Sequence, residues 1–295
     1  MKKIGRLLTA MITPFDENGH IDYLQAKNLA RALINSGSDG LVIGGTTGEA
    51  PSMSDEEKIQ LFKVIVEEIG DEGSVIAGTT DNNHRKSIEL SKEAEKVGVD
   101  ALLLTVPAYN KPQQTGLFFH FQAIAQSTNL PCILYNVPGR TSLNMTTETT
   151  LKLAQIDNII GIKEASSDIE QITNIIKNSP ENFQVWSGND DETFGIMTLG
   201  GFGIVSVASN IIGNQIKKMM NYILEGDFIK ASDEHKRLLP IFKALFWETN
   251  PVPIKYAVNK SGFNVGETRL PMYNPSKEFK EKFDPIFKEY KIDLI

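Results

Sequence analysis

The feature that most constrains the fold of this chain is a set of short apolar segments that recur at regular intervals. The segments are spaced 19 to 34 residues apart and begin at Leu7, Leu41, Val75, Ala101, Cys132, Ile159, Gln184 and Gly203. This spacing leaves room for a helix and two loops, which is typical of parallel strands joined by helical crossovers. The nearly continuous apolar character fits strands that are covered on both faces. The pattern favours a closed (β/α)8 TIM barrel, with an open doubly wound sheet as the alternative.

Helix signals fill the intervals between these segments. Asp22 with Gln25 opens one helix, and Ser54 with Glu57 forms a capping-box pair at the start of the next. After about Gly226 the strand rhythm stops, and three helices are predicted at 227–246, 253–260 and 276–290. No Gly/Ser-rich linker precedes this tail. We therefore expect a catalytic barrel over residues 1–225 and a C-terminal helical region over residues 226–295 that packs on it.

Composition excludes several classes of protein. With 41% apolar residues the 295-residue chain can bury a full core, so it is not mainly disordered. A formal charge of −7 argues against general nucleic-acid binding, which needs a basic surface. The single cysteine, Cys132, cannot form an internal disulfide, and Arg6 and Pro14 interrupt any signal-peptide core. We expect a cytoplasmic protein without a membrane span, and the four histidines are too scattered in sequence to suggest a metal site.

Chemically suggestive residues follow several of the apolar segments. In a (β/α)8 barrel the active site lies at the C-terminal ends of the strands. The segments at these predicted ends are GGTTGE (44–49), PAYNKP (107–112), YNVPGR (135–140), KEAS (163–166) and SGND (187–190). We therefore expect the active site among these five segments.

Lys163 is the residue that selects a mechanism. It ends the apolar run IIGI (159–162), so its side chain should lie at the mouth of the barrel. An amine held there loses hydration, which disfavours its charged form and lowers its pKa. A neutral amine can attack a ketone and form a Schiff base. The ordinary alternative is a lysine that reaches out to water.

Hydroxyl groups at other strand ends could move the proton that such chemistry requires. Tyr135 ends a neighbouring strand, and its phenol could donate a proton and recover it. Thr46, Thr47 and Tyr109 offer further hydroxyls. The alternatives are a wall residue for Tyr135, hydroxyls that bond their own turn for the threonines, and a packing residue for Tyr109.

Arg140 follows Tyr135 by five residues, in a loop stiffened by Pro138. A guanidinium group can hold a carboxylate through two parallel hydrogen bonds, so Arg140 suits an acidic substrate. The alternative is a surface arginine paired with a carboxylate of the protein.

The glycines at 44–45 and 200–203 could cradle phosphate, but glycines near barrel strands more often permit tight packing, and no P-loop motif is present. The acidic run 190–192 reads as the first turn of a helix.

Together these motifs resemble the pyruvate-dependent class I aldolase superfamily and, within it, the dihydrodipicolinate synthase family. The resemblance runs from TAMITPF (9–15) to NPVPIK (250–255), and GTTGE, YNVPGRT, GIKEAS and SGND occur in the family's order. Sialic acid lyases and ketodeoxygluconate aldolases, its neighbours in the superfamily, typically lack an arginine at the position of Arg140. The resemblance therefore implies a (β/α)8 enzyme whose second substrate carries a carboxylate.

The resemblance also implies a role for each residue. Lys163 would form the Schiff base with pyruvate, and Tyr135, Thr47 and Tyr109 would form a proton relay, with Tyr109 reaching into a neighbouring subunit. Substrate binding would fall to Thr46, Thr47 and Arg140, and to Gly188 and Val205 through their backbone groups; Val205 replaces an isoleucine that is frequent in the family. We expect condensation of pyruvate with L-aspartate 4-semialdehyde, the entry step of diaminopimelate and lysine biosynthesis, without a metal or an organic cofactor. The family usually builds a tetramer, a dimer of dimers.

Two alternatives remain at this point. The chain could be another pyruvate-dependent aldolase that acts on a keto-sugar acid, against which Arg140 argues. It could also be a non-catalytic barrel that senses a keto acid, in which loss of Lys163 or Tyr135 would be expected; neither is lost. For L-lysine, an inhibitor of some family members, the matching positions are Ala50, Pro51, Lys58, Asn82, Lys86 and Ala108, and they predict weak inhibition or none.

Overall fold

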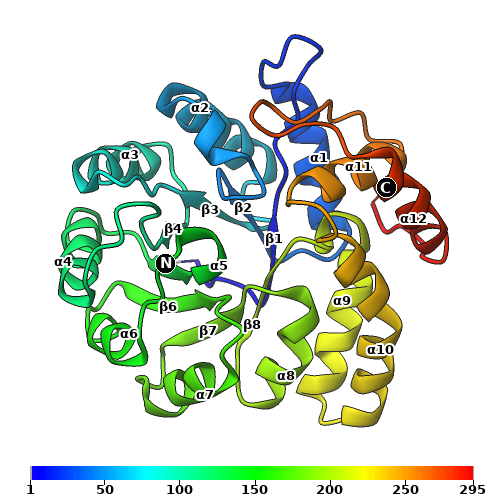
Figure 1. Ribbon diagram of the computed structural model, residues 1–295. Helices are drawn as coiled ribbons and strands as arrows, with labels where there is room; N and C mark the ends of the chain where they lie inside the picture. Colours follow the sequence, from blue (N-terminus) through cyan, green and yellow to red (C-terminus); the bar gives the residue numbers. More distant parts are fainter. Residues whose placement is uncertain (1, 295) are drawn as a thin grey trace.

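A closed barrel of eight parallel strands forms the centre of the computed structural model, which describes residues 2–294 (Figure 1). The strands are β1 (Leu7–Ala10), β2 (Gly40–Ile43), β3 (Ser74–Gly78), β4 (Ala101–Thr105), β5 (Cys132–Asn136), β6 (Ile159–Glu164), β7 (Gln184–Ser187) and β8 (Gly203–Ser206). Each strand pairs in parallel with the next, and β8 pairs with β1. Every strand begins within one residue of a predicted apolar segment. The predicted barrel is confirmed, and the open sheet is excluded.

Most helices surround the barrel on its outside, whereas the short helix α5 (Pro138–Thr141) lies over the middle of the barrel (Figure 1). Those of the barrel are α1 (Tyr23–Asn35), α2 (Asp55–Ile69), α3 (His84–Lys96), α4 (Gln114–Ala125), α5 (Pro138–Thr141), α6 (Thr147–Leu153), α7 (Ile169–Asn178), α8 (Thr193–Thr198) and α9 (Ser209–Leu224), with the 3₁₀ turns η1 (Ala50–Ser52) and η2 (Asp190–Glu192). The expected helix starts are present. The Asp22 side chain accepts a hydrogen bond from the Gln25 N–H, and Ser54 and Glu57 make both hydrogen bonds of the capping box.

Side chains fill the interior of the barrel. Trp186 is fully buried there, and its Nε1 donates to the Gly5 carbonyl at 3.0 Å. The neighbouring strand contributes Gly161, where an added Cβ would lie 2.6 Å from the Trp186 ring, so the indole fits because that position has no side chain. Because the interior is packed rather than hollow, a small molecule can bind only at the ends of the strands.

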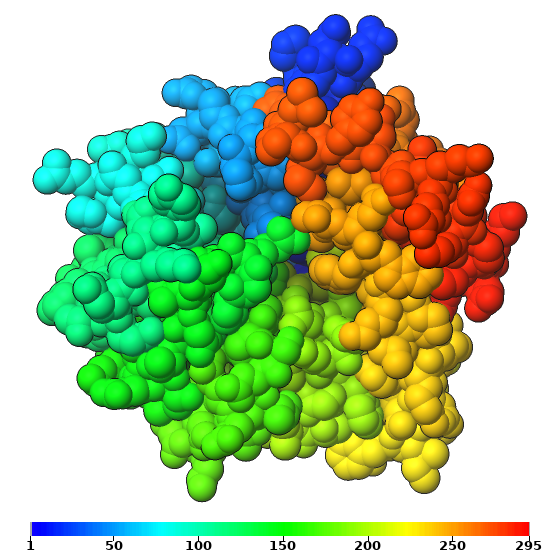
Figure 2. Space-filling view, in the orientation of Figure 1, coloured from blue at the N-terminus to red at the C-terminus, as the bar shows by residue number. Residues whose placement is uncertain are grey.

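The C-terminal region consists of α10 (Phe228–Ala244), α11 (Val252–Lys260) and α12 (Lys277–Phe287), close to the three predicted helices. Segments near residues 50, 140 and 250, coloured blue, green and orange, meet near the middle of the face in Figure 2. The C-terminal region therefore contributes directly to the surface beside the barrel mouth. The boundary at residue 225 stays a prediction. Between residues 2 and 294, no helix is long and apolar enough to cross a membrane.

Candidate active site

Lys163 lies near the C-terminal end of β6 and faces the barrel interior. Its register partners are Tyr135 on β5 and Trp186 on β7, and the Lys163 side chain is only 6% exposed. Burial lowers the pKa of the Lys163 amine to about 7; the Asp190 carboxylate opposes this shift, and the Arg140 guanidinium adds to it. A substantial fraction of the amine is therefore neutral at neutral pH, and the neutral form is the nucleophile.

Tyr135 lies beside this amine. The Lys163 Nζ is 4.1 Å from the centroid of the Tyr135 ring. Burial raises the pKa of the Tyr135 phenol to about 12, although Arg140 and the Thr46 side chain oppose the shift. The phenol consequently keeps its proton at neutral pH and can act as a donor.

The residues that follow these two hold the strand ends together from the outside of the barrel. Asn136 Nδ2 donates to Glu164 Oε1 at 3.1 Å and to Asn144 Oδ1 at 2.8 Å, and Gln171 Nε2 donates to Glu164 Oε2 at 3.2 Å. Asn136 and Glu164 are fully buried. Successive side chains along a strand point to opposite faces. The hydrogen bonds of Asn136 and Glu164 on the outer face therefore hold β5 and β6 in register, with Tyr135 and Lys163 side by side on the inner face.

The two threonines lie in the turn after β2. An added Cβ on Gly78 would lie 2.2 Å from the Gly44 carbonyl oxygen, so β3 packs directly against this turn. Thr47 is buried, and its Oγ1 accepts a hydrogen bond from Asn250 Nδ2 at 3.0 Å. One acceptor site of the Thr47 hydroxyl is thus occupied, and its proton is available to another group.

Arg140 belongs to α5, which stands at the mouth of the barrel. Its Nη2 donates to the Asn250 carbonyl oxygen at 3.1 Å. A guanidinium group has five N–H donors, so a single bond of this kind orients the group and leaves most donors available. Asn250 therefore contacts both the threonine turn and the arginine.

A small cavity collects most of the predicted site residues. Among its lining residues are Thr46, Thr47, Tyr135, Arg140, Lys163, Gly188, Asn250 and Val207. An added Cβ on Gly188 would lie 3.2 Å from Lys163 Cε and 2.7 Å from Ala165 Cβ, so a side chain there would press on the lysine.

Two predicted residues lie elsewhere. Val205 is fully buried beside Leu8 and is not among the cavity-lining residues, whereas Val207, two residues further along the chain, is; a role of the Val205 backbone in the site stays a prediction. Tyr109 is 92% exposed, with a positive φ of 66°, and does not line the cavity. The fold of this chain alone therefore does not bring Tyr109 to Lys163.

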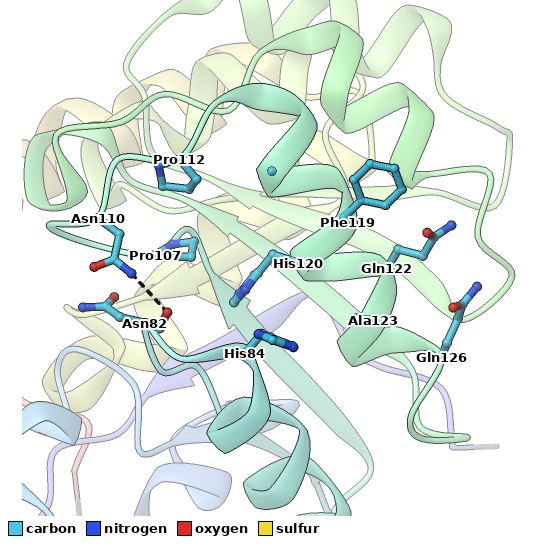
Figure 3. A pocket seen from close by; sticks show the side chains of 11 residues that line it. Asn82, His84, Pro107, Asn110, Pro112, Phe119, His120, Gln122, Ala123 and Gln126 are labelled. Atoms are coloured by element: carbon cyan, nitrogen blue, oxygen red, sulfur yellow. Dashed lines mark hydrogen bonds between the residues drawn. The ribbon is translucent and has the colours of Figure 1, made fainter.

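A separate pocket lies between α3 and α4, behind the loop that carries Tyr109. His84 and His120 line it together with Asn110, whose Nδ2 donates to the Asn82 carbonyl oxygen at 3.2 Å (Figure 3). Burial, with a smaller contribution from His84, lowers the pKa of His120 to about 4. The fold thus brings together two histidines that are distant in sequence. Residues 2–294 contain no group of three or more His, Cys, Asp or Glu that could hold a metal ion.

Comparison with known proteins agrees with this geometry. The model of the dihydrodipicolinate synthetase family matches residues 3–290. The chain belongs to this family. A 4-hydroxy-tetrahydrodipicolinate synthase from Dehalococcoides mccartyi (strain ATCC BAA-2266 / KCTC 15142 / 195) is 49% identical over 294 residues, which cover 100% of this chain and 99% of that protein. The corresponding enzyme of Symbiobacterium thermophilum is 48% identical over 290 residues, 98% of this chain and 99% of the other.

Solved structures of the family have the same fold. A dihydrodipicolinate synthase from Bacillus anthracis superposes with a TM-score of 0.96 at 42% identity, covering 99% of this chain and 100% of that one. A synthase from Cyanidioschyzon merolae, solved with lysine bound, gives a TM-score of 0.95 at 40% identity and 97% coverage of both chains.

Two further residues contribute to the site, although their contribution was not predicted from the sequence. Asp190, expected in the first turn of a helix, is buried in η2 and accepts hydrogen bonds from the Ser206 hydroxyl and from the Val207 and Ala208 N–H groups. It joins the ends of β7 and β8, and burial raises the pKa of Asp190 to about 6. The other residue is Asn250. The only sequence signals were the acid in SGND and the asparagine that opens NPVPIK.

Proposed function

We propose that this chain condenses pyruvate with L-aspartate 4-semialdehyde through a Schiff base on Lys163 and gives 4-hydroxy-tetrahydrodipicolinate, a lyase reaction. The observation that carries the proposal is the buried Lys163 amine beside the Tyr135 phenol, with a pKa of about 7 for the amine and about 12 for the phenol. The family and the names of its members support the reaction.

The first half of the reaction requires a neutral amine and a proton donor. The Lys163 amine attacks the pyruvate ketone, and the Tyr135 phenol donates a proton to the oxygen that leaves as water. Thr47 is suited to pass the proton on, because its hydroxyl proton is not used in its contact with Asn250. Thr46 and Thr47 are the donors that we assign to the pyruvate carboxylate.

The second half joins the two substrates. Loss of a methyl proton converts the imine into an enamine, whose carbon attacks the aldehyde of the semialdehyde. The substrate amino group then attacks the imine carbon, which closes the ring and releases the Lys163 amine. Arg140, held by the Asn250 carbonyl, is the group that we assign to the semialdehyde carboxylate.

We further propose that the chain acts as a tetramer, a dimer of dimers, in the cytoplasm. Tyr109 supports an oligomer, because a relay tyrosine that is 92% exposed can take part only if it enters the site of another copy. Sedimentation velocity tests the assembly.

The single cysteine, Cys132, supports a reducing compartment.

A coupled assay tests the proposed reaction. Purified protein receives pyruvate with L-aspartate 4-semialdehyde, and a parallel sample receives a keto-sugar acid. We expect turnover of the first pair only. Cleavage of the keto-sugar acid without condensation would instead identify another pyruvate-dependent aldolase, the alternative that the guanidinium group of Arg140 at the barrel mouth disfavours.

A further inference from the structure

A buried ion pair lies just outside the catalytic cavity. Lys255 Nζ on α11 is 2.8 Å from Glu49 Oε1, and both side chains are only 2% exposed. The second carboxylate oxygen, Glu49 Oε2, accepts the Arg269 N–H at 2.9 Å. Both oxygens of this carboxylate are therefore used, and neither charge is in contact with solvent.

This arrangement is costly, and the helix has other contacts that dock it. Removing two charges from water carries a desolvation penalty that their attraction only partly offsets. Glu49 also adopts a positive φ of 60°, a backbone conformation that is unfavourable for a residue other than glycine. Meanwhile α11 already buries apolar side chains, including Ile254, Ala257 and Val258.

The pair joins two segments that meet again inside the cavity. Glu49 follows Thr47 by two residues, and Lys255 lies in the first turns of α11, which begins directly after Asn250 and Pro251. The Lys255 N–H donates to the Pro251 carbonyl at 2.9 Å, so the lysine is rigidly connected to this helix start. The ion pair and the 3.0 Å hydrogen bond between Asn250 Nδ2 and Thr47 Oγ1 therefore connect the same two segments, with the hydrogen bond on the cavity side.

Further contacts hold the pair from the outer side. Arg269 donates to both oxygens of Glu57 on α2, at 2.9 and 2.6 Å. The Phe15 ring packs against both cations, with its centroid 3.9 Å from Lys255 Nζ and 4.3 Å from Arg269 Cζ. Glu49 thus has little freedom to move, and neither does the turn that precedes it.

We propose that Glu49 and Lys255 are positioning residues for the reaction: their ion pair holds the Thr47 hydroxyl and, through Asn250, the Arg140 guanidinium in their working orientations. This inference rests on the function proposed above. If the pair is lost, the turn and the start of α11 separate, so Thr47 loses the donor that orients it. Arg140 loses its fixed acceptor at the same time. Proton relay and recognition of the second substrate should then suffer together.

Paired variants separate positioning from stability. Lys255→Met and Glu49→Gln each leave one buried group without its partner, whereas the double variant Glu49→Gln/Lys255→Met removes both charges. Replacing a buried ion pair by neutral groups is frequently harmless to stability, while breaking one partner is not. We therefore expect the double variant to recover the unfolding midpoint but to keep kcat at least about tenfold low. We also expect a raised KM for the semialdehyde.

The matched control is Lys260→Met on the same helix. Lys260 Nζ is 2.9 Å from Asp284 on α12, and neither residue touches the threonine turn. This variant should keep wild-type kcat, KM and borohydride trapping of pyruvate. All assays are run well below the unfolding midpoint of each variant, which is measured by circular dichroism.

The outcomes decide between the two roles. A double variant with wild-type kcat and KM would overturn the proposal and leave the pair a structural role only. If a single variant does not fold, the double variant decides. Failure of the wild-type protein to condense the two substrates would instead refute the proposed function. This outcome is distinguishable because it is measured on the wild-type protein alone.

Discussion

Lys163 and Tyr135 are register partners on adjacent strands, and the lysine Nζ lies 4.1 Å from the centroid of the tyrosine ring. The same burial acts on the two groups in opposite directions. It lowers the pKa of the amine and raises the pKa of the phenol, because each group loses the hydration of its charged form. A neutral nucleophile and a protonated donor can therefore coexist at neutral pH.

Pyruvate with borohydride should label Lys163, and the rate of labelling should report its pKa. Reduction turns the imine into a stable amine that mass spectrometry locates. Because burial lowers the pKa of Lys163 from the ordinary lysine value of 10.5 to about 7, trapping should rise as pH increases through about 7 and then level off. A rate that keeps rising towards pH 10 would contradict the depressed value.

Lys255 provides an internal control for this experiment. Burial also lowers the pKa of Lys255, to about 8, with Glu49 opposing the shift. Its amine is enclosed against Glu49 and does not line the catalytic cavity. We expect no label on Lys255, and Lys163→Ala should lose both the label and nearly all turnover. Labelling of another lysine with Lys163 unmodified would refute the mechanism.

Arg140→Ala should damage the semialdehyde step more than imine formation. Loss of a charge-assisted hydrogen bond costs roughly 1.5–3 kcal/mol, about 10- to 150-fold, which should fall on kcat/KM for the semialdehyde. The variant also removes a cation that lowers the pKa of Lys163, so this pKa should rise and the pH at which trapping reaches half its maximum should shift to a higher value. Equal losses in trapping and condensation would show that Arg140 does not select the second substrate.

Tyr109→Phe should lower activity by removing a hydroxyl while keeping the ring. If Tyr109 acts across an interface, mixing Tyr109→Phe subunits with Lys163→Ala subunits should restore part of the activity. A mixed interface then contains one site with an intact lysine and a donated tyrosine. Fluorescently labelled subunits establish that exchange has occurred. No recovery after exchange would assign Tyr109 a role within its own subunit or none.

The sequence was sufficient to predict the barrel and the proximity of Lys163 and Tyr135, for a physical reason. Parallel strands bring their C-terminal ends to one edge, so polar residues that end apolar runs, such as Lys163 and Tyr135, must lie near one another. Long-range contacts were not predictable in this way. Asn250 reaches Thr47 across about two hundred residues of chain, and no periodicity encodes that bond.

Register and assembly explain the other differences. Val205 lies within β8, whereas Val207 follows the end of the strand and therefore lies at the cavity, and the apolar run alone did not indicate where the strand ends. Asp190 stands in an acidic run that ordinarily marks an exposed helix start, and only the close approach of β8 buries it. Tyr109 is exposed in the single chain, and the role that we propose for it depends on a partner subunit that one chain cannot supply.

L-lysine should inhibit this protein weakly or not at all, and the structure sharpens the reason. One cavity of about 660 Å³ is lined by all six positions that the resemblance assigned to an inhibitor site, Ala50, Pro51, Lys58, Asn82, Lys86 and Ala108. None of these six positions carries a carboxylate, but Asp55 and Asp81 also line the cavity. However, Asp55 Oδ1 is already paired with Lys58 Nζ at 3.3 Å, and Asp81 Oδ1 accepts the Asn83 N–H at 2.7 Å.

The charge of this cavity therefore disfavours a cationic ligand. Because Lys58 and Asp55 largely neutralise one another, the remaining positive charge comes from Lys86 and Arg140, which outnumber Asp81. Two like charges about 4 Å apart repel by roughly 4 kcal/mol at an effective dielectric of 20. Titration of L-lysine against the condensation assay tests this, and half-inhibition below about 1 mM would contradict it, since that affinity corresponds to about 4 kcal/mol of binding. Lys86→Glu reverses one exposed charge of the cavity and should increase the sensitivity to L-lysine, whereas Lys63→Glu, at an exposed position on α2 outside the cavity, should not.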